Sequence, residues 1–171
     1  MDGRARGNEQ RGGEQLRGSD ATAERVLKAL RHATWAHFAC HATADLISPS
    51  NGGLNLADGL LPLSAISALD LPDAQLAYLS ACSTASAGPR LADQALHLAS
   101  AFQLAGFRHV IASLWPVGDQ AAAAVAQAFY QALPDGSPGD PARTLNQVSR
   151  ELRAAYPDRL EVWASFVHYG P

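Results

Sequence analysis

Three continuous apolar runs, each short enough to form a single strand, recur along the chain and alternate with segments of helical periodicity. The runs lie at residues 35–40, 76–81 and 109–115. Apolar side chains recur at helical spacing in four further segments, at 20–32, 91–105, 119–133 and 140–156. Strands that are apolar along their whole length are typical of parallel sheets buried on both faces. The pattern therefore predicts an α/β domain in which helices cover both faces of a mostly parallel sheet.

Two further segments complete the predicted domain. Residues 46–62 carry an Asn-Gly-Gly run at 51–53 and an Asp-Gly pair at 58–59, which are turn signals around a short hairpin. The apolar and aromatic end of the chain, residues 161–169, is predicted to return as a strand or to dock on the core.

Capping residues mark where the predicted helices begin and end. Asp20, Asp119 and Asp140 each stand where an N-cap is expected, and Pro141 suits the first helical position. Gly106 is expected to end the helix that begins near residue 91.

Composition limits the classes of protein to which the chain can belong. Of 171 residues, 47% are hydrophobic and only 17% are charged, with a net charge of −3. This balance excludes a nucleic-acid binder that works by bulk positive charge. No apolar run approaches the roughly 20 residues that span a bilayer, so no membrane association is expected.

The polar beginning of the chain differs in character from the rest. Residues 1–19 are rich in Gly, Arg and Gln and are predicted to form a disordered leader, followed by one domain over 20–171. The two cysteines cannot make a disulfide framework, and a reducing cytoplasm is the expected compartment.

Candidate chemistry lies where the predicted strands end. His41 follows the first apolar run, Cys82 follows the second, and the turn at 115–119 follows the third. Ligands of open parallel sheets bind outside the carboxyl ends of the strands. If the first two strands are neighbours, an imidazole can support a cysteine thiolate and later protonate a leaving group. Spacing alone does not distinguish this pair from any other two strand ends.

The residues around these two positions make the pattern more specific. The His-Phe-Ala-Cys-His run at 37–41 and the Leu-Ser-Ala-Cys-Ser-Thr run at 79–84 resemble the paired signatures of the CHAT-domain family, caspase-like peptidases related to separase. Further matching segments follow in order, at 58–61, 105–107, 113–119 and 163–167 with Gly170. The resemblance therefore extends from about Asp20 to Gly170.

The resemblance implies a caspase-like fold and a function for the two strand-end residues. It implies that His41 is the catalytic histidine and Cys82 the nucleophile of an endopeptidase that acts on a protein or peptide substrate. The backbone N–H groups of Cys82 and Ala42 would donate to the oxyanion. The family needs no metal or organic cofactor, so none is expected.

Two departures from the family pattern carry expectations of their own. Ala42 stands where the family usually has Gly, so either the turn differs or a methyl group enters the site and a positive φ becomes costly. The family's upstream strand and helix are not found before Asp20, which would leave a sheet edge exposed. A helical-repeat or other upstream partner, or a homodimer, could complete that edge.

The other candidate residues have simpler interpretations. Cys40 and His37 are expected to pack in the core, and the remaining histidines have no partner at metal-ligand spacing. Asp119 is interpreted first as a helix cap, with a substrate contact as the second possibility. The alternative to a peptidase is a catalytically impaired interaction module, and an esterase or acyl transferase with the same dyad is a more distant third.

Overall fold

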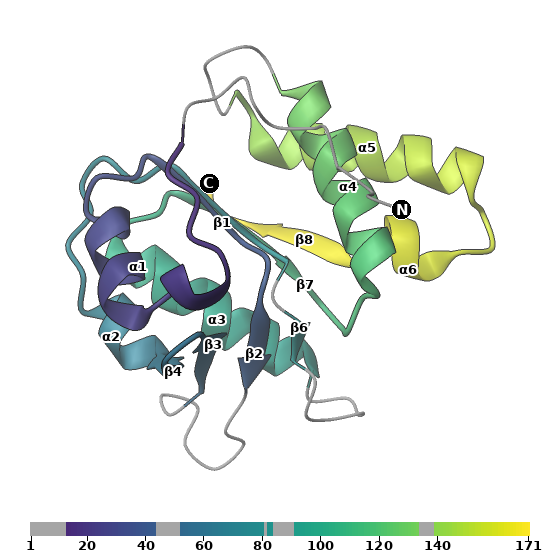
Figure 1. Ribbon diagram of the computed structural model, residues 1–171. Helices are drawn as coiled ribbons and strands as arrows, with labels where there is room; N and C mark the ends of the chain where they lie inside the picture. The colour runs from purple at the N-terminus through teal and green to yellow at the C-terminus, as the bar shows by residue number, and fades with distance from the viewer. Residues whose placement is uncertain (1–12, 44–51, 81, 84–90, 134–138) are drawn as a thin grey trace.

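The computed structural model (Figure 1) describes residues 13–43, 52–80, 82–83, 91–133 and 139–171. The predicted polar leader, 1–19, lies mostly outside these residues. In its described part, Leu16 packs against the core, and a short 3-10 helix, η1 (Gly18–Asp20), extends from the leader into the first residue of the predicted domain. Among the described residues, no helix combines the length and the apolar character needed to cross a bilayer.

The first sheet holds the three predicted apolar strands. Its order is β1 (Trp35–Phe38), β5 (Leu76–Leu79), β7 (His109–Ser113) and β8 (Phe166–Tyr169). β1, β5 and β7 are parallel, and β8 is antiparallel to β7. All four residues of β5 are buried, because this strand has a neighbour on each side and helices over both faces. The continuous apolar run reflects that position.

A second, smaller sheet continues from the ends of β1 and β5. Its order is β4 (Gly59–Pro62), β3 (Gly53–Leu56), β2 (His41–Thr43) and β6 (Cys82–Ser83). β3 and β4 form the predicted hairpin, β2 is antiparallel to β3, and β6 is parallel to β2.

The predicted single strands that end at His41 and Cys82 are therefore wrong in one respect. Each run is divided between two strands in different sheets, β1 then β2 and β5 then β6. The physical reason lies in the pattern: the three residues of β2 are exposed, buried and exposed in turn. Such alternation suits a sheet with one face in water, whereas the run before it suits a sheet covered on both faces.

One layer of helices covers the first face. It consists of α1 (Ala23–Leu30), α2 (Leu63–Ser67) and α3 (Leu91–Ala105), visible at the left and lower centre of Figure 1. Its apolar core cluster includes the fully buried Phe102, and also buried side chains of the second sheet, Ala42, Leu54 and Leu61. The second sheet is thus fixed to the same core as the first.

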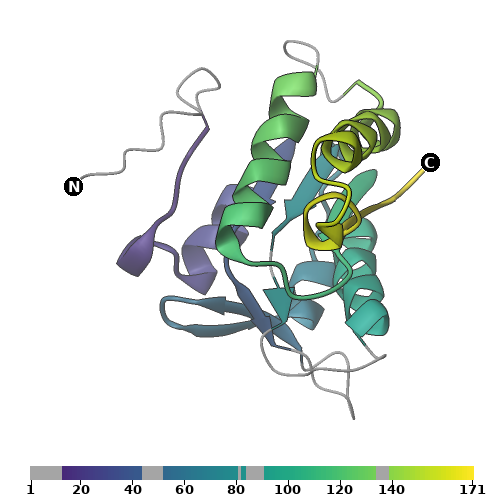
Figure 2. The ribbon, with the colours of Figure 1, turned by 90° about the vertical axis from the view of Figure 1, so that its right-hand side faces the viewer.

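The opposite layer covers the other face and is turned toward the viewer in Figure 2. It consists of α4 (Asp119–Ala132), α5 (Pro141–Ala155) and α6 (Leu160–Trp163). Its core cluster is centred on Phe129 and the fully buried Tyr78. The prediction of a mostly parallel sheet with helices on both faces is confirmed, and the architecture is compatible with a caspase-like fold.

Two of the three predicted N-caps are wrong. α1 is capped by Thr22, whose hydroxyl accepts from the Arg25 N–H at 3.4 Å, while Asp20 forms an ion pair with the Arg25 guanidinium instead. α4 has Gly118 at its N-cap, so Asp119 is the first helical residue. An acidic residue at this place still interacts favourably with the helix dipole.

The other two helix-boundary predictions are confirmed. The Asp140 carboxylate accepts from the Arg143 N–H at 2.9 Å, with Pro141 at the first turn of α5. Gly106 ends α3 with a φ of 123°, a conformation that other residues rarely adopt. A Cβ there would also lie 2.4 Å from the Leu71 carbonyl oxygen.

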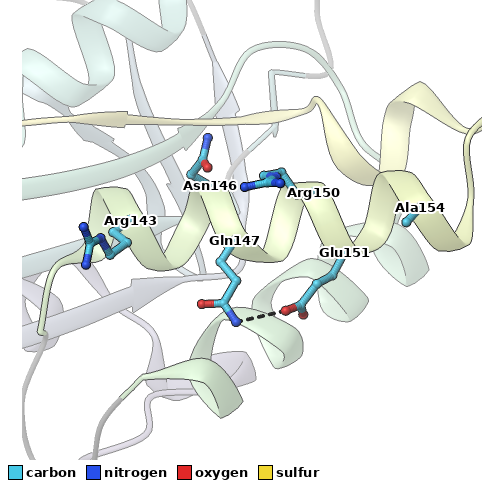
Figure 3. A pocket seen from close by; sticks show the side chains of 6 residues that line it. All are labelled: Arg143, Asn146, Gln147, Arg150, Glu151 and Ala154. Carbon is cyan, nitrogen blue, oxygen red and sulfur yellow. Dashed lines mark hydrogen bonds between the residues drawn. The ribbon is translucent and has the colours of Figure 1, made fainter.

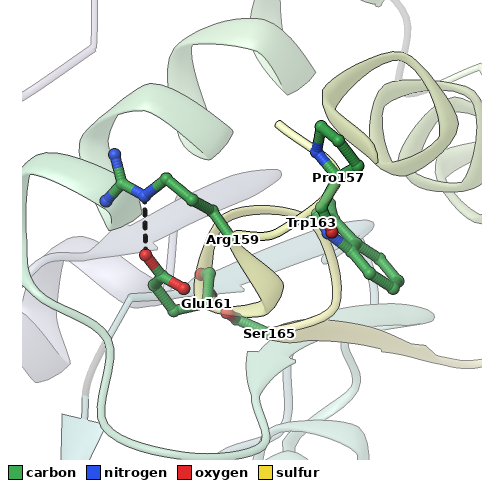
Figure 4. Close-up of polar contacts among 5 residues, drawn as sticks. All are labelled: Pro157, Arg159, Glu161, Trp163 and Ser165. Atoms are coloured by element: carbon green, nitrogen blue, oxygen red, sulfur yellow. Dashed lines mark hydrogen bonds and ion pairs between the residues drawn. The ribbon is translucent and has the colours of Figure 1, made fainter. Parts of the chain in front are cut away.

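The end of the chain returns to the first sheet through α6 and β8, as predicted. Around α6 (Figure 4), the Trp163 indole donates to the Pro157 carbonyl at 3.3 Å, and Arg159 pairs with Glu161 at 2.8 Å. The Arg153 guanidinium lies 5.1 Å from the centre of the Trp163 ring. These contacts fix the turn from which β8 begins its pairing with β7.

Candidate active site

The backbone register of the second sheet brings His41 and Cys82 together. His41 is the first residue of β2, and its Cα partners are Asn55 on β3 and Cys82 on β6. Neighbouring strands of a sheet lie about 4.8 Å apart. The backbones at His41 and Cys82 are therefore direct neighbours, although 40 residues separate them in the sequence. Residues 81 and 84–90, on either side of β6, lie outside the described residues.

The second sheet has one buried and one exposed face, which alternate along its strands. Ala42, Leu54 and Leu61 are Cα partners in one row and are all buried in the core. The adjacent row contains His41, Asn55 and Leu60, which are all exposed. His41 thus lies on the solvent side of the sheet, where a substrate could reach it.

Two polar side chains of the exposed face are joined beside His41. The Thr43 hydroxyl donates to the Asn55 Oδ1 at 3.1 Å. Thr43 lies opposite Gly53, which offers no side chain that could lie between Thr43 and Asn55. Glycine is required at this position, because a Cβ would lie 2.1 Å from the Leu61 carbonyl oxygen on β4.

The expectations about Ala42 are corrected in part. Its side chain is 8% exposed and belongs to the core cluster, so the methyl group does not enter the exposed face that carries His41. Among the described residues, only glycines have a positive φ, so Ala42 carries no such strain. Its Cα partners are Leu54 on one side and Ser83 on the other. The contribution of its N–H to an oxyanion hole stays a prediction.

Cys40 is a packing residue, as predicted. It is a free, half-buried thiol that packs against the core, and burial raises its pKa to about 11. At neutral pH this thiol stays protonated and is a poor nucleophile.

His37 is not the buried core residue that was expected. It lies on β1 and is partly exposed, but its ring packs at a tilt against Tyr78 and Tyr130, with centroid distances of 5.0 Å and 5.6 Å. Its Nε2 lies 3.1 Å from the Ser80 hydroxyl. Desolvation among these rings lowers the pKa of His37 to about 4, so the imidazole is neutral at physiological pH.

Asp119 is exposed at the start of α4, after the carboxyl end of β7. The prediction that it is a helix cap is wrong, and the prediction that it contacts substrate stays a prediction. No signal in the sequence singled out Asn55 and Thr43, whose place beside His41 depends on the register between β2 and β3.

Other polar clusters lie away from the second sheet. His109 and His168, for which no metal site is predicted, lie beside each other: His109 Nδ1 is 3.0 Å from His168 Nε2 across β7 and β8. Desolvation is the main cause that lowers the pKa of both histidines. In the described part of the chain, no three His, Cys, Asp or Glu side chains gather as metal ligands.

A shallow pocket lies on the opposite helix layer. All of the described residues that line it belong to α5, and Figure 3 shows the Gln147 amide donating to Glu151 at 2.9 Å beside Arg143 and Arg150. It shares no residue with the exposed face of the second sheet and is no part of the candidate active site.

Comparison with known sequences agrees with the architecture. The model of the CHAT domain matches residues 4–171, which is almost the whole chain. Comparison with curated proteins gives no match. The match includes both sheets, both helix layers and the positions of His41 and Cys82. The chain belongs to the CHAT-domain family.

Proposed function

We propose that this chain is a cysteine-type endopeptidase domain in which Cys82 is the nucleophile and His41 is the general acid and base. The observation that supports this most directly is the register of β2 and β6, in which His41 and Cys82 are Cα partners. Membership of the CHAT-domain family, which is related to caspase-like peptidases, supports the interpretation of this pair as a catalytic dyad. The proposed substrate is a protein or a peptide.

The reaction proceeds by acyl transfer. The Cys82 thiolate attacks the carbonyl carbon of the scissile peptide bond, and a tetrahedral oxyanion forms. The C–N bond then breaks, and the His41 imidazolium gives its proton to the leaving amine. Water attacks the resulting thioester after His41 takes one of its protons, which releases the carboxylic acid and regenerates the Cys82 thiol. The backbone N–H of Cys82 is the predicted oxyanion donor, with that of Ala42 as the second.

The environments of His41 and His37 support the choice of His41 as the catalytic histidine. His41 is exposed on the face where a substrate could approach, and its backbone is beside Cys82. His37 is held neutral among aromatic rings on a different sheet, and its partner is Ser80. A neutral imidazole of low pKa supports a thiolate poorly, since it cannot supply the neighbouring positive charge.

The alternative is an interaction module that keeps the fold without catalysis. One reason to consider it was the Ala42 methyl group, and this group lies in the core and not in the site. Asp119, at the carboxyl end of β7, fits a peptidase that contacts a basic substrate residue. A measurement of peptide cleavage decides between the peptidase and the interaction module.

The direct test is digestion of a peptide library by the intact chain and by His41→Ala. The wild type is expected to cleave a defined subset of peptides, and His41→Ala to lose at least about 100-fold in rate because general acid-base catalysis is lost. His41 is exposed, so the variant is expected to fold, and its circular dichroism spectrum checks this. Absence of cleavage by the wild type, or equal cleavage by both, would overturn the proposal in favour of the interaction module or of a different chemistry.

A further inference from the structure

The exposed face of the second sheet carries a polar residue directly beside the proposed catalytic histidine. We propose that Asn55 is a positioning residue that fixes the orientation and tautomer of the His41 imidazole. This inference rests on the proposed function for its catalytic meaning, while the nearness of the two residues rests on the sheet register. The family signatures quoted above do not include this residue.

The register places the two side chains within reach of each other. Asn55 is the Cα partner of His41 across an antiparallel pair, and both side chains are exposed on one face. Cβ atoms of residues directly opposite in such a pair lie about 4.5–5.5 Å apart. A carboxamide and an imidazole at that separation can form a hydrogen bond without any change of backbone.

Thr43 holds the carboxamide in one orientation. Its hydroxyl donates to the Asn55 Oδ1 at 3.1 Å, which identifies this side of the amide as the acceptor side. An amide oxygen has two lone pairs, so Oδ1 can accept a second hydrogen bond from the Nδ1–H of His41. The three residues therefore form a polar group on the exposed face, with Asn55 between Thr43 and His41.

The chemical consequence concerns the second ring nitrogen. A hydrogen bond from Nδ1–H to Asn55 fixes the proton on Nδ1 and leaves the lone pair on Nε2 for proton exchange with Cys82 and the leaving group. A neutral amide orients the ring in this way without adding a second negative charge beside a thiolate. In metal sites, too, a hydrogen bond from the second ring N–H of a histidine to an outer partner fixes the tautomer and the orientation of the ring.

The test measures the tautomer of His41 and the kinetics separately. Imidazole ¹⁵N spectra of the intact chain, recorded at a pH where His41 is neutral, are expected to show mainly the Nδ1–H form. Asn55→Leu removes the acceptor and is expected to shift His41 toward the Nε2–H form. In peptide cleavage, the same variant is expected to lower kcat about 10- to 100-fold with little change in KM.

Matched variants separate positioning from a general structural effect. Thr43→Val removes only the hydroxyl and is expected to shift the tautomer in the same direction by less. Asn146→Leu, at an exposed asparagine on α5, is expected to change neither the tautomer nor kcat. If Asn55→Leu is poorly folded, Asn55→Ala provides the same comparison with a smaller side chain that also lacks an acceptor.

The outcomes distinguish the two proposals. An unchanged His41 tautomer in Asn55→Leu or Asn55→Ala would overturn the role of Asn55, whether or not the chain cleaves peptides. A shifted tautomer in a chain without cleavage would uphold the positioning contact and overturn the peptidase assignment. A fall in kcat without a tautomer shift would also count against Asn55 as a positioning residue.

Discussion

Cys82→Ala is expected to abolish peptide cleavage and to leave the fold intact. Without the thiol no acyl-enzyme can form, and loss of a nucleophile costs about 10⁴-fold or more in kcat when the remaining groups act only through it. Cys82 lies in a two-residue strand, β6, at the edge of the second sheet, so the substitution removes little of the sheet. The measurement is the rate of cleavage of the peptides that the wild type cleaves best.

Cys40→Ala is the matched control, because it removes the chain's other cysteine. Cys40 is half-buried against the core and its pKa of about 11 keeps it protonated, so its loss is expected to leave the cleavage rate within a few-fold of wild type. Cleavage that survives in Cys82→Ala, or that disappears in Cys40→Ala with the fold intact, would show that Cys82 is not the nucleophile.

Phe102→Ala is expected to give the largest loss of stability from a single side chain. Phe102 is fully buried on α3 and packs edge-on against Phe38 of β1 and Phe107, with centroid distances of 5.2 Å and 5.7 Å. Truncation of such a side chain removes its burial and leaves a cavity, which costs about 3–5 kcal/mol. Urea denaturation should show a lower midpoint with an unchanged slope.

Leu104→Ala, two residues away on the same helix, is the control for this prediction. Leu104 is 74% exposed, so the substitution removes almost no buried surface and is expected to change the unfolding free energy by less than about 0.5 kcal/mol. Similar losses in the two variants would contradict the placement of α3 against the first sheet. A loss below about 1 kcal/mol in Phe102→Ala would contradict it as well.

The first sheet could be predicted from the sequence, and the second sheet could be predicted only in part. β1, β5 and β7 come from continuous apolar runs, and the hairpin of β3 and β4 follows from its turn residues. The division of two runs into β1 with β2, and β5 with β6, was missed. Its signal is weak, because the alternation of β2 extends over only three residues, 41–43.

In the candidate site, too, the residues that could be predicted are those marked by the local sequence pattern. His41 and Cys82 could be identified because each follows a strand. Asn55 could not, because its position depends on the register between β2 and β3, which pair antiparallel. A shift of one residue in that register would place Asn55 on the buried face and Leu54 beside His41. The two alternatives for Ala42 could not be decided for the same reason, since the direction of its methyl group follows from the pairing of β2.

The central claim is that His41 and Cys82 act as one unit, and the pKa of the Cys82 thiol tests it most directly. An imidazolium beside a thiolate stabilises the charged form and lowers the thiol pKa below the ordinary value of about 8.5. The thiolate is then present at every pH above the lowered pKa, and it is lost as the pH falls through it. The measurement is the rate of iodoacetamide alkylation of Cys82 against pH, followed by mass spectrometry in wild type and His41→Gln.

The design uses the difference between the two cysteines of the chain. Because burial holds the pKa of Cys40 at about 11, labelling in the neutral range reports Cys82, with Cys82→Ala as the blank. The predicted result is a wild-type midpoint well below 8.5 that rises to the ordinary range in His41→Gln. A midpoint near 8.5 that is the same in both proteins would contradict the dyad.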